Sequence, residues 1–362
     1  MSALKKLTIR GFKSIEALED FELRPLNVLI GANGAGKSNL ISFFRLAREI
    51  VNERLELFVN THGADGLFFL GPRVTRKISA KVEFDEMAYA FDLVPAVDRH
   101  VLLSDRGSPK GAELGTLGSI SDGVRESDLR GLNALFPGPF SHIVEQIEGW
   151  HTFHFNDTNL LAPMRRTQSA RDFSYLRSEA ENIAAVLLHL RARHPGHYQM
   201  IRDTVRLGAP FFDDFDLRPE TIGGVEHVRL EWRQRGSDFP FQPAHFSDGT
   251  IRFICLVTAL MQPNLPLMIL IDEPELGMHP FALSLLADLI KSAATKAQIV
   301  VSTQSDRFVD EFAVEDVVTV RRQGAASVFE RLQPEPLADW LRDYTLGELW
   351  QKNVVRAGPE HG

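Results

Sequence analysis

The sequence has very little cysteine and no long apolar segment. Cys255 is the single cysteine among 362 residues, which excludes an internal disulfide framework and a cysteine-based zinc site. No stretch approaches the roughly 20 apolar residues that cross a bilayer. No apolar segment with a small-residue cleavage site follows Met1, so no secretory signal is expected. We therefore expect a cytoplasmic protein that does not contact a membrane.

An excess of positive charge is also lacking. The chain has 40 Lys and Arg residues against 48 Asp and Glu residues, a formal net charge of −8. Proteins that coat nucleic acid are usually basic overall, so a DNA contact would need a local patch. Hydrophobic residues make up 44% and charged residues 24% of the chain. These proportions are typical of a globular protein and exclude a chain that is disordered overall.

A glycine-rich segment lies between a predicted buried strand, Leu26 to Ile30, and a predicted helix that starts near Lys37. Its sequence GANGAGKS, residues 31–38, fits the Walker A pattern G-x-x-x-x-G-K-[ST]. Glycines let successive backbone amides point at phosphate oxygens, and the helix N-terminus adds partial positive charge. The residues predicted to bind nucleotide are Asn33, Gly34, Gly36, Lys37, Ser38 and Asn39.

Two side chains of this segment have predicted roles in the chemistry. The Lys37 ammonium should reach the β- and γ-phosphates, and the Ser38 hydroxyl should hold Mg²⁺. The alternative is an accidental match, which average residue frequencies would produce in roughly one chain of this length in a hundred.

Two carboxylates follow an apolar strand at residues 267–271. Ligands of parallel sheets bind at the carboxyl ends of the strands. Asp272 is predicted to organise Mg²⁺, and Glu273 is predicted to polarise the attacking water as general base. The alternative is a strand that simply leaves the core for solvent.

A third motif carries a family resemblance. The segment FSDGT, residues 246–250, opens an apolar helix before Asp272 and resembles the signature motif of ABC-type ATPases in its Ser-x-Gly form. The segment IRGFKS, residues 9–14, and Asn33 resemble the SMC and RecF branch. The segment DEPELGMHP, residues 272–280, is similar to the Walker B and D-loop of compact bacterial AAA-type ATPases found in defence and overcoming-lysogenisation (OLD) contexts.

This resemblance implies an α/β fold: an ABC/SMC-type P-loop ATPase head with a mixed sheet and an inserted, mainly helical subdomain. It implies ATP and Mg²⁺ as cofactors. It also implies that Ser247 and Gly249 bind the γ-phosphate of ATP held by an opposite subunit, hence an ATP-dependent homodimer. A helix N-terminus is a suitable anion site. The alternative for Ser247 is an ordinary helix N-cap, and both roles can hold at once.

The sequence departs from the family pattern in two places. Family members often carry a switch histidine after the strand that follows Walker B, whereas Gln304 stands at that position here. A glutamine amide can hydrogen-bond a γ-phosphate or the attacking water but cannot carry charge. We therefore expect Gln304 to act in hydrolysis that is slow or differently gated. No Q-loop glutamine can be placed between residues 60 and 90.

The predicted division of the chain follows its composition. The Gly-, Ser- and Asp-rich residues 104–123 are expected to form a loop and a boundary, and the tail after Arg356 is expected to fray. The expected parts are an N-terminal lobe of the head at 1–103, a mainly helical insertion at 104–211, a C-terminal lobe at 212–335, and C-terminal helices and a tail at 336–362.

Other residues have weaker predicted roles. His151, His154 and Asp157 could suggest a metal site, but residues 151 and 154 face opposite sides of a predicted strand, so we expect none. Cys255 is predicted to be buried on the apolar helix. The most basic stretch is either a solvated, salt-bridged surface or a patch for DNA or a partner. Its arginines are Arg165, Arg166, Arg171 and Arg177.

The leading hypothesis is an ATP-driven switch. ATP closes the dimer, hydrolysis through Glu273 reopens it, and the change regulates a partner effector, a nuclease or toxin that acts in trans. The resemblance places this activity in anti-phage or genome defence. The first alternative is a RecF-like DNA-binding repair ATPase. The second, motivated by Gln304, is a nucleotide-stabilised scaffold without enzymatic activity.

Overall fold

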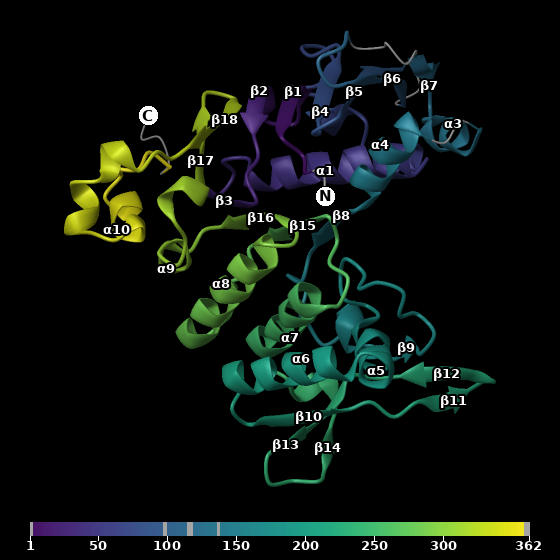
Figure 1. The fold of residues 1–362 in the computed structure, drawn as a ribbon, viewed down its shortest axis with the longest axis vertical. Coiled ribbons are helices and arrows are strands. Elements are labelled where there is room, and N and C mark those ends of the chain that lie inside the picture. The colour runs from purple at the N-terminus through teal and green to yellow at the C-terminus, as the bar shows by residue number, and fades with distance from the viewer. Residues whose placement is uncertain (1–2, 97–99, 114–118, 136–137, 358–362) are drawn as a thin grey trace. The chain divides into compact units, whose positions relative to one another are not determined.

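A computed structural model of the chain describes residues 3–96, 100–113, 119–135 and 138–357. Its ribbon is drawn in Figure 1. Internal contacts divide the chain into two units, whose limits fall inside three strands of one sheet. The first unit contains Met1–His151, Pro266–Leu270 and Val300–Gly362, and the second contains Thr152–Leu265 and Ile271–Ile299. The predicted division at residues 103 and 211 has other limits, and it stays a prediction.

An antiparallel sheet of six strands lies in the first unit, in the order β2-β1-β4-β5-β6-β7. Buried and partly exposed residues alternate along β4, because successive side chains of a strand point to opposite faces. The strands are β1 (Lys6–Phe12), β2 (Ile15–Glu22), β4 (Ile78–Glu83), β5 (Met87–Pro95), β6 (Val101–Pro109) and β7 (Ser119–Val124).

The prediction of a loop at residues 104–123 was wrong, because β6 and β7 occupy most of it. Asp105 pairs with Phe91 across the β5–β6 ladder. Its carboxylate is buried and accepts hydrogen bonds of 2.7 Å from the Tyr89 and Ser127 hydroxyls. Burial raises the pKa of Asp105. Polar residues can therefore continue a strand when residues elsewhere in the chain hydrogen-bond to them. Residues 114–118 of the predicted loop lie outside the described residues.

A second sheet of six strands has the order β18-β17-β3-β16-β15-β8. It is mixed, since β17 runs parallel to β3 and antiparallel to β18. Every residue of β3 is buried, which confirms the interpretation of its apolar run. The strands are β3 (Leu26–Ile30), β8 (Trp150–Phe153), β15 (Met268–Asp272), β16 (Gln298–Thr303), β17 (Val317–Gln323) and β18 (Ala326–Arg331).

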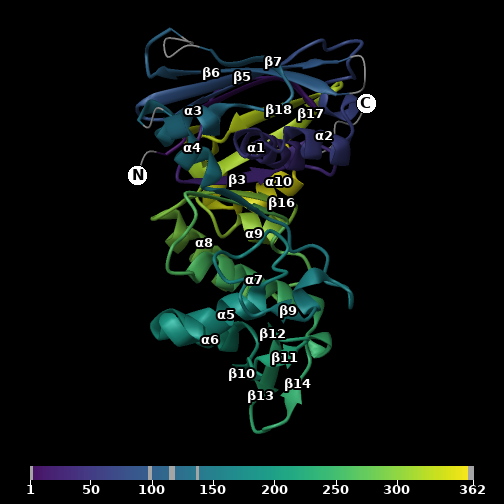
Figure 2. The ribbon, with the colours of Figure 1, turned by 90° about the vertical axis from the view of Figure 1, so that its right-hand side faces the viewer.

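Helix α1 (Lys37–Val51) follows β3 and lies between the antiparallel sheet and the β3–β17–β18 strands of the same unit (Figure 2). Its apolar residues, such as Phe43, share one hydrophobic core with residues of both sheets, among them Ile9 and Val318. Phe43 stacks on Phe91 with ring centroids 6.0 Å apart. The core therefore holds both ends of α1, and with them the loop that precedes it.

The second unit contains four longer helices and two sheets of three strands, ordered β10-β13-β14 and β11-β12-β9. Its helices are α5 (Ile183–Arg193), α6 (Pro195–Gly208), α7 (Asp248–Met261) and α8 (Pro280–Ala294). Its short strands are β9 (Gln168–Ser169), β10 (Phe212–Asp216), β11 (Glu220–Ile222), β12 (Val225–Val228), β13 (Glu231–Gln234) and β14 (Pro240–Phe241). Cys255 on α7 is fully buried, as predicted.

The remaining helical elements of the described residues are five shorter α-helices and six 3-10 turns. The helices are α2 (Leu55–His62), α3 (Leu129–Leu135), α4 (Pro139–Glu148), α9 (Asp306–Val309) and α10 (Leu346–Gln351). The turns are η1 (Asp65–Leu67), η2 (Pro163–Arg165), η3 (Pro243–His245), η4 (Val314–Asp316), η5 (Glu335–Leu337) and η6 (Trp340–Arg342). Among the described residues, no helix has both the length and the apolar composition that crossing a bilayer requires.

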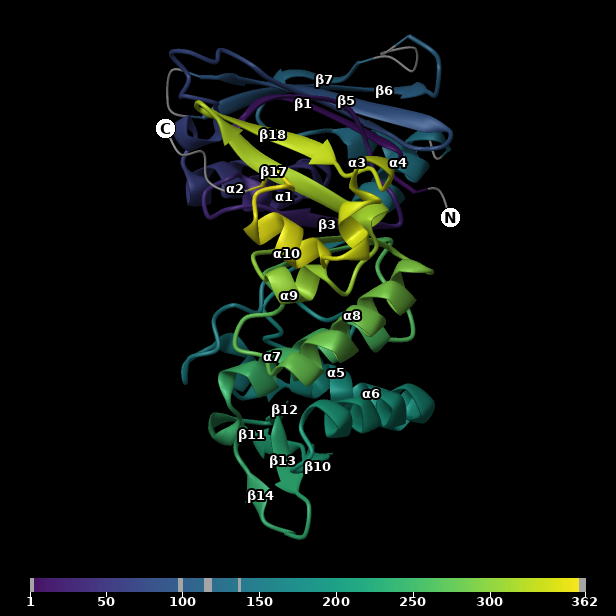
Figure 3. The same cartoon turned by 90° about the vertical axis from the view of Figure 1, so that its left-hand side faces the viewer.

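The C-terminal segment packs on the first unit. Helices α9 and α10 lie side by side (Figure 3), and Leu349 of α10 is fully buried. Ala357 is buried too, and its carbonyl accepts a hydrogen bond of 3.1 Å from the Ala32 amide of the glycine-rich loop. The predicted fraying therefore does not apply to Ala357, and residues 358–362 lie outside the described residues.

Candidate functional site

The turn between β3 and α1 packs so closely on neighbouring strands that two of its positions admit only glycine. A Cβ atom at Gly31 would overlap the Val320 carbonyl oxygen of β17. A Cβ atom at Gly36 would overlap the Ser327 hydroxyl of β18 and lie 2.7 Å from the Ser14 hydroxyl. Gly36 also has a φ of 113°, a backbone conformation that glycine adopts readily. The sheet thus fixes the path of the Walker A segment.

The end of this turn is electropositive. Lys37 is 5% exposed, and its Nζ donates hydrogen bonds of 2.7 Å and 3.2 Å to the carbonyls of Gly31 and Ala32. Helix α1 has no side-chain N-cap and no acidic residue in its first turn. Its N-terminal amides and the Lys37 ammonium therefore present positive charge at one place. These residues fit a phosphate group, as Walker A predicts.

A set of hydroxyl and amide groups braces this loop, and sequence reasoning missed most of it. The Ser327 Oγ of β18 lies 2.7 Å from the Ser14 Oγ and 2.5 Å from the Ala35 carbonyl oxygen. Asn39, which was predicted to bind nucleotide, donates from its Nδ2 to the Ser14 Oγ at 2.6 Å. Asn39 therefore has a bracing role in this structure. Ser14 belongs to the SMC-like segment at residues 9–14, which was its only signal in the sequence.

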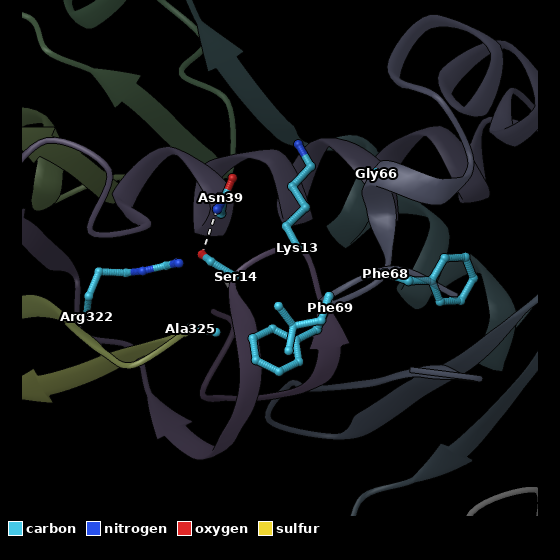
Figure 4. A pocket seen from close by; sticks show the side chains of 9 residues that line it. Lys13, Ser14, Asn39, Gly66, Phe68, Phe69, Arg322 and Ala325 are labelled. Carbon is cyan, nitrogen blue, oxygen red and sulfur yellow. Dashed lines mark hydrogen bonds between the residues drawn. The ribbon is translucent and has the colours of Figure 1, made fainter. Parts of the chain in front are cut away.

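A cleft of about 360 Å³ opens beside these residues in the first unit (Figure 4). Lys13 at its wall donates to the Ser42 Oγ of α1 at 2.7 Å, and its φ of 50° is left-handed. Burial, and then the charge of Arg45, lower the pKa of Lys13. The cleft is lined by Lys13, Ser14, Asn39, Gly66, Phe68, Phe69, Leu70, Arg322 and Ala325. Its two cations, amide and phenyl rings suit a ligand that has both polar and planar apolar parts.

The predicted Walker B residues lie in the second unit. Asp272 ends β15, and Glu273 follows with a φ of 49°. A left-handed conformation is uncommon outside glycine, and such residues cluster at functional sites because the surrounding structure must hold them there. Both acids are half-buried. Their positions fit the prediction, and their roles as metal ligand and general base stay predictions.

The predicted signature serine caps α7. Ser247 is exposed, and its Oγ accepts a hydrogen bond of 3.2 Å from the Thr250 amide, which confirms the N-cap reading. Gly249 lies against the segment after Walker B, because a Cβ there would overlap the Gly277 carbonyl oxygen. Residues 246–250, called the signature turn below, and the predicted D-loop after Walker B are therefore in direct contact within the second unit.

Arg252, one turn further along α7, strengthens this contact. Its guanidinium donates to the carbonyl of Leu276 in the D-loop and to the carbonyls of Phe155 and Asn156, the last two at 2.9 Å and 3.1 Å. Burial lowers the pKa of Arg252. The sequence did not single out this residue, because only the fold shows that the carbonyls converge.

Gln304 directly follows β16, which is the neighbour of β3 in the mixed sheet. Its side chain is exposed. It therefore stands where the switch histidine was expected, after the strand that follows Walker B. Its part in hydrolysis stays a prediction.

The four arginines predicted as a possible DNA patch do not form one exposed surface. The Arg165 side chain is 3% exposed, so its assignment to a DNA-binding surface was wrong. Arg177 is paired with Asp172 at 2.8 Å. Arg166 and Arg171 are exposed. Because arginine is charged, the sequence indicated that Arg165 would face solvent. The fold instead buries it in the second unit, where carbonyls and a carboxylate accept its hydrogen bonds.

His151 was one of two histidines weighed as metal ligands. Among the described residues, no three His, Cys, Asp or Glu side chains come together in a geometry for a metal ion. Burial, followed by the charge of Arg48, lowers the pKa of His151 from 6.5 to about 4. The ring is therefore neutral in the folded protein at neutral pH.

This shifted pKa predicts acid sensitivity. Between pH 6.5 and 4 the unfolded chain binds a proton at His151 and the folded chain does not. The free energy of unfolding should therefore fall as the pH drops through this window, by about 3 kcal/mol in all. In urea titrations, His151→Gln should lose this part of the decline. An equal decline in both proteins would contradict the prediction.

Comparisons with known proteins agree with this geometry. A family model described as "AAA domain, putative AbiEii toxin, Type IV TA system" matches residues 146–310, and one described as "AAA domain" matches residues 6–48. The second match includes Walker A, and the first includes the signature turn, Walker B and Gln304. A search among curated proteins gives no significant match.

Solved structures of SMC heads share the fold. One is an Smc head bound to the C-terminal winged-helix domain of ScpA, with a TM-score of 0.63 at 16% identity over 93% of this chain and 99% of that chain. Another is an Smc head with an extended coiled coil bound to the C-terminal domain of ScpA, derived from Pyrococcus furiosus. Its TM-score is 0.58 at 15% identity over 95% of this chain and 99% of that chain. The chain thus has the predicted ABC/SMC-type P-loop ATPase fold.

Proposed function

We propose that the protein is an ATPase that binds ATP with Mg²⁺ and joins two copies of itself around the nucleotide. The observation that carries this proposal is the turn of residues 31–38. Two of its glycines, Gly31 and Gly36, are held against β17 and β18, and Lys37 and the N-terminus of α1 present positive charge there. Such a turn is suited to a polyphosphate. The adjoining cleft beside Lys13 would take the nucleoside.

Four further side chains have proposed roles in hydrolysis. Ser38 and Asp272 would hold Mg²⁺, which supplies charge neutralisation between the phosphates when bound. Glu273 would accept a proton from the attacking water, and Gln304 would orient that water by hydrogen bonding. Because Gln304 cannot carry charge, turnover is expected to be slow.

Pairing of two copies is proposed from the signature turn. Ser247 is exposed at the N-terminus of α7, and Gly249 is buried against the segment after Walker B, which holds the turn in place. Hydroxyl and amide donors at a helix N-terminus suit an anion brought by another molecule. We propose that this anion is the γ-phosphate of ATP bound to a second copy.

The biological role is proposed from the comparisons. The description of the matched family model names a toxin and a toxin–antitoxin system, and both similar SMC heads are bound to a domain of ScpA. We propose that the ATP-dependent dimer regulates a partner protein, a nuclease or toxin in trans, in anti-phage or genome defence. A DNA-binding role has less support, since Arg165 is buried.

Glu273→Gln tests the proposal, because an amide cannot accept the proton from water. Phosphate release by the wild type should be measurable, and the variant should lose it by at least about 100-fold. ATP should then trap the variant as a dimer in light scattering during size exclusion. Equal phosphate release by both proteins would remove Glu273 from hydrolysis. ATP binding without turnover in the wild type would favour the scaffold.

A further inference from the structure

The Arg165 guanidinium is buried. It donates hydrogen bonds to three backbone carbonyls and one carboxylate in two turns of the chain. Its Nε donates to the Thr158 carbonyl at 2.9 Å. Its Nη1 donates to the carbonyls of Pro243 and Phe246, the latter at 3.2 Å, and its Nη2 reaches the Phe246 carbonyl at 3.2 Å. The Nη2 also donates to Asp248 Oδ1 at 3.0 Å.

Three of these four acceptor residues lie close to the signature serine in the sequence. Phe246 and Asp248 flank Ser247, and Pro243 begins the turn that leads to it. A planar guanidinium with five N–H donors can hold several acceptors in fixed directions at once. Arg165 therefore fixes the backbone just before Ser247 and the side chain just after it.

Aromatic packing holds the same turn through Phe246. The Phe246 ring stacks on Trp232 of β13 with centroids 4.6 Å apart and planes 17° apart. Trp232 also stacks on Phe241 of β14, with centroids 4.9 Å apart. Stacked rings of this kind have a preferred geometry. The turn is thus held in two ways. The Phe246 side chain stacks on Trp232, and the backbone carbonyls of Pro243 and Phe246 accept hydrogen bonds from Arg165.

Arg165 also changes the charge beside Ser247. Asp248 is exposed next to the serine, and an unpaired carboxylate there would repel a phosphate. The ion pair with Arg165 offsets that charge. This pair is more than a surface salt bridge, because the arginine side chain is 3% exposed while the aspartate is 67% exposed.

We propose that Arg165 is a positioning residue that places the Ser247 hydroxyl and the α7 N-terminus for a phosphate carried by a second copy of the chain. This inference rests on the proposed function, since it assigns a residue to the same ATP-dependent pairing. Arg165 does not touch the nucleotide. It acts through the carbonyls of Pro243 and Phe246 and through Asp248.

Arg165→Lys is the test, because lysine keeps the charge but its single ammonium cannot reach all of these acceptors. The kcat for ATP should fall by about 100-fold, the scale of a misplaced reacting group. The KM should stay within about twofold, because residues 31–38 hold ATP in its own subunit. In the Glu273→Gln background, the added Arg165→Lys should abolish the ATP-dependent dimer in size exclusion.

Arg206→Lys is the matched control. Arg206 lies in the same unit and also bonds one backbone carbonyl and two carboxylates, those of Asp213 and Asp203, and none of these bonds reaches the signature turn. It should keep kcat and dimer formation within about twofold of the wild type. Equal losses in both variants would overturn the positioning role and indicate general destabilisation.

Amide hydrogen exchange separates this inference from the proposed function. In the wild type without ATP, the Thr250 amide should exchange slowly, since Ser247 accepts its hydrogen bond. Arg165→Lys should speed exchange across residues 246–251. If exchange is faster in Arg165→Lys but Glu273→Gln forms no ATP-dependent dimer, the proposed dimer is wrong. The role of Arg165 in positioning the signature turn is then supported. A rapidly exchanging Thr250 in the wild type, or unchanged exchange in folded Arg165→Lys, overturns the inference.

Discussion

Lys37→Met is expected to remove at least about two thirds of the stabilisation by ATP while leaving the protein folded. In the wild type, ATP at 100 times its Kd should raise the free energy of unfolding by about 2.7 kcal/mol. The variant removes the ammonium that would face the phosphates. Loss of one partner of a desolvated charge pair costs about 2–5 kcal/mol, so the affinity should fall between about 30-fold and several thousandfold. Thermal unfolding with and without ATP–Mg²⁺ measures this.

The nucleotide-free protein should tolerate this change because two effects oppose each other. Lys37 is 5% exposed, and replacing a buried charge with an apolar chain removes a desolvation cost. The carbonyls of Gly31 and Ala32 lose a donor, which costs about 1–3 kcal/mol. Lys81→Met, on a partly exposed lysine paired with Glu83, should keep the ATP effect. If ATP–Mg²⁺ stabilised Lys37→Met as much as it stabilises the wild type, Lys37 would have no part in ATP binding.

Gly249→Ala is expected to disable the signature turn. The added methyl group would overlap the Gly277 carbonyl oxygen, which belongs to the backbone and cannot swing away. Overpacking of this kind costs about 1–3 kcal/mol. Because Gly249 is two residues after Ser247, the displaced turn should move the serine. The kcat should fall by about 100-fold or more, and ATP-dependent pairing should be lost. Calorimetric ATP binding should persist, since it relies on residues 31–38.

Gly196→Ala provides the matched control for Gly249→Ala. Gly196 lies in the first turn of α6, and nothing stands within 4 Å of a Cβ built there. Its replacement should leave the activity unchanged and raise stability by up to about 1 kcal/mol, since alanine restricts the unfolded chain. If Gly249→Ala kept full turnover, the signature turn would have no part in hydrolysis.

Local patterns in the sequence predicted the elements around the motifs well. The apolar run of β3, the start of α1 at Lys37 and the capping of α7 by Ser247 are all present. Each depends on neighbours within a few residues: burial of a short run, helical periodicity, or a hydroxyl three residues before an amide. For this reason they could be recognised without tertiary information.

Long-range contacts produced what the sequence did not predict. The polar strand at Asp105 is stabilised by Tyr89 and Ser127, and the Walker A segment is braced by Ser327, 292 residues from Ala35. Local composition indicates neither partner.

The sequence by itself determined that the chain has a Walker A segment before a helix, a capped helix after Ser247 and an apolar strand followed by acidic residues, because each is encoded in consecutive residues. Only the tertiary structure decided that Arg165 supports Ser247 instead of facing DNA, and that Gly249 touches Gly277. The physical reason is that burial of a charge and close approach of two backbones depend on partners that only folding brings into contact.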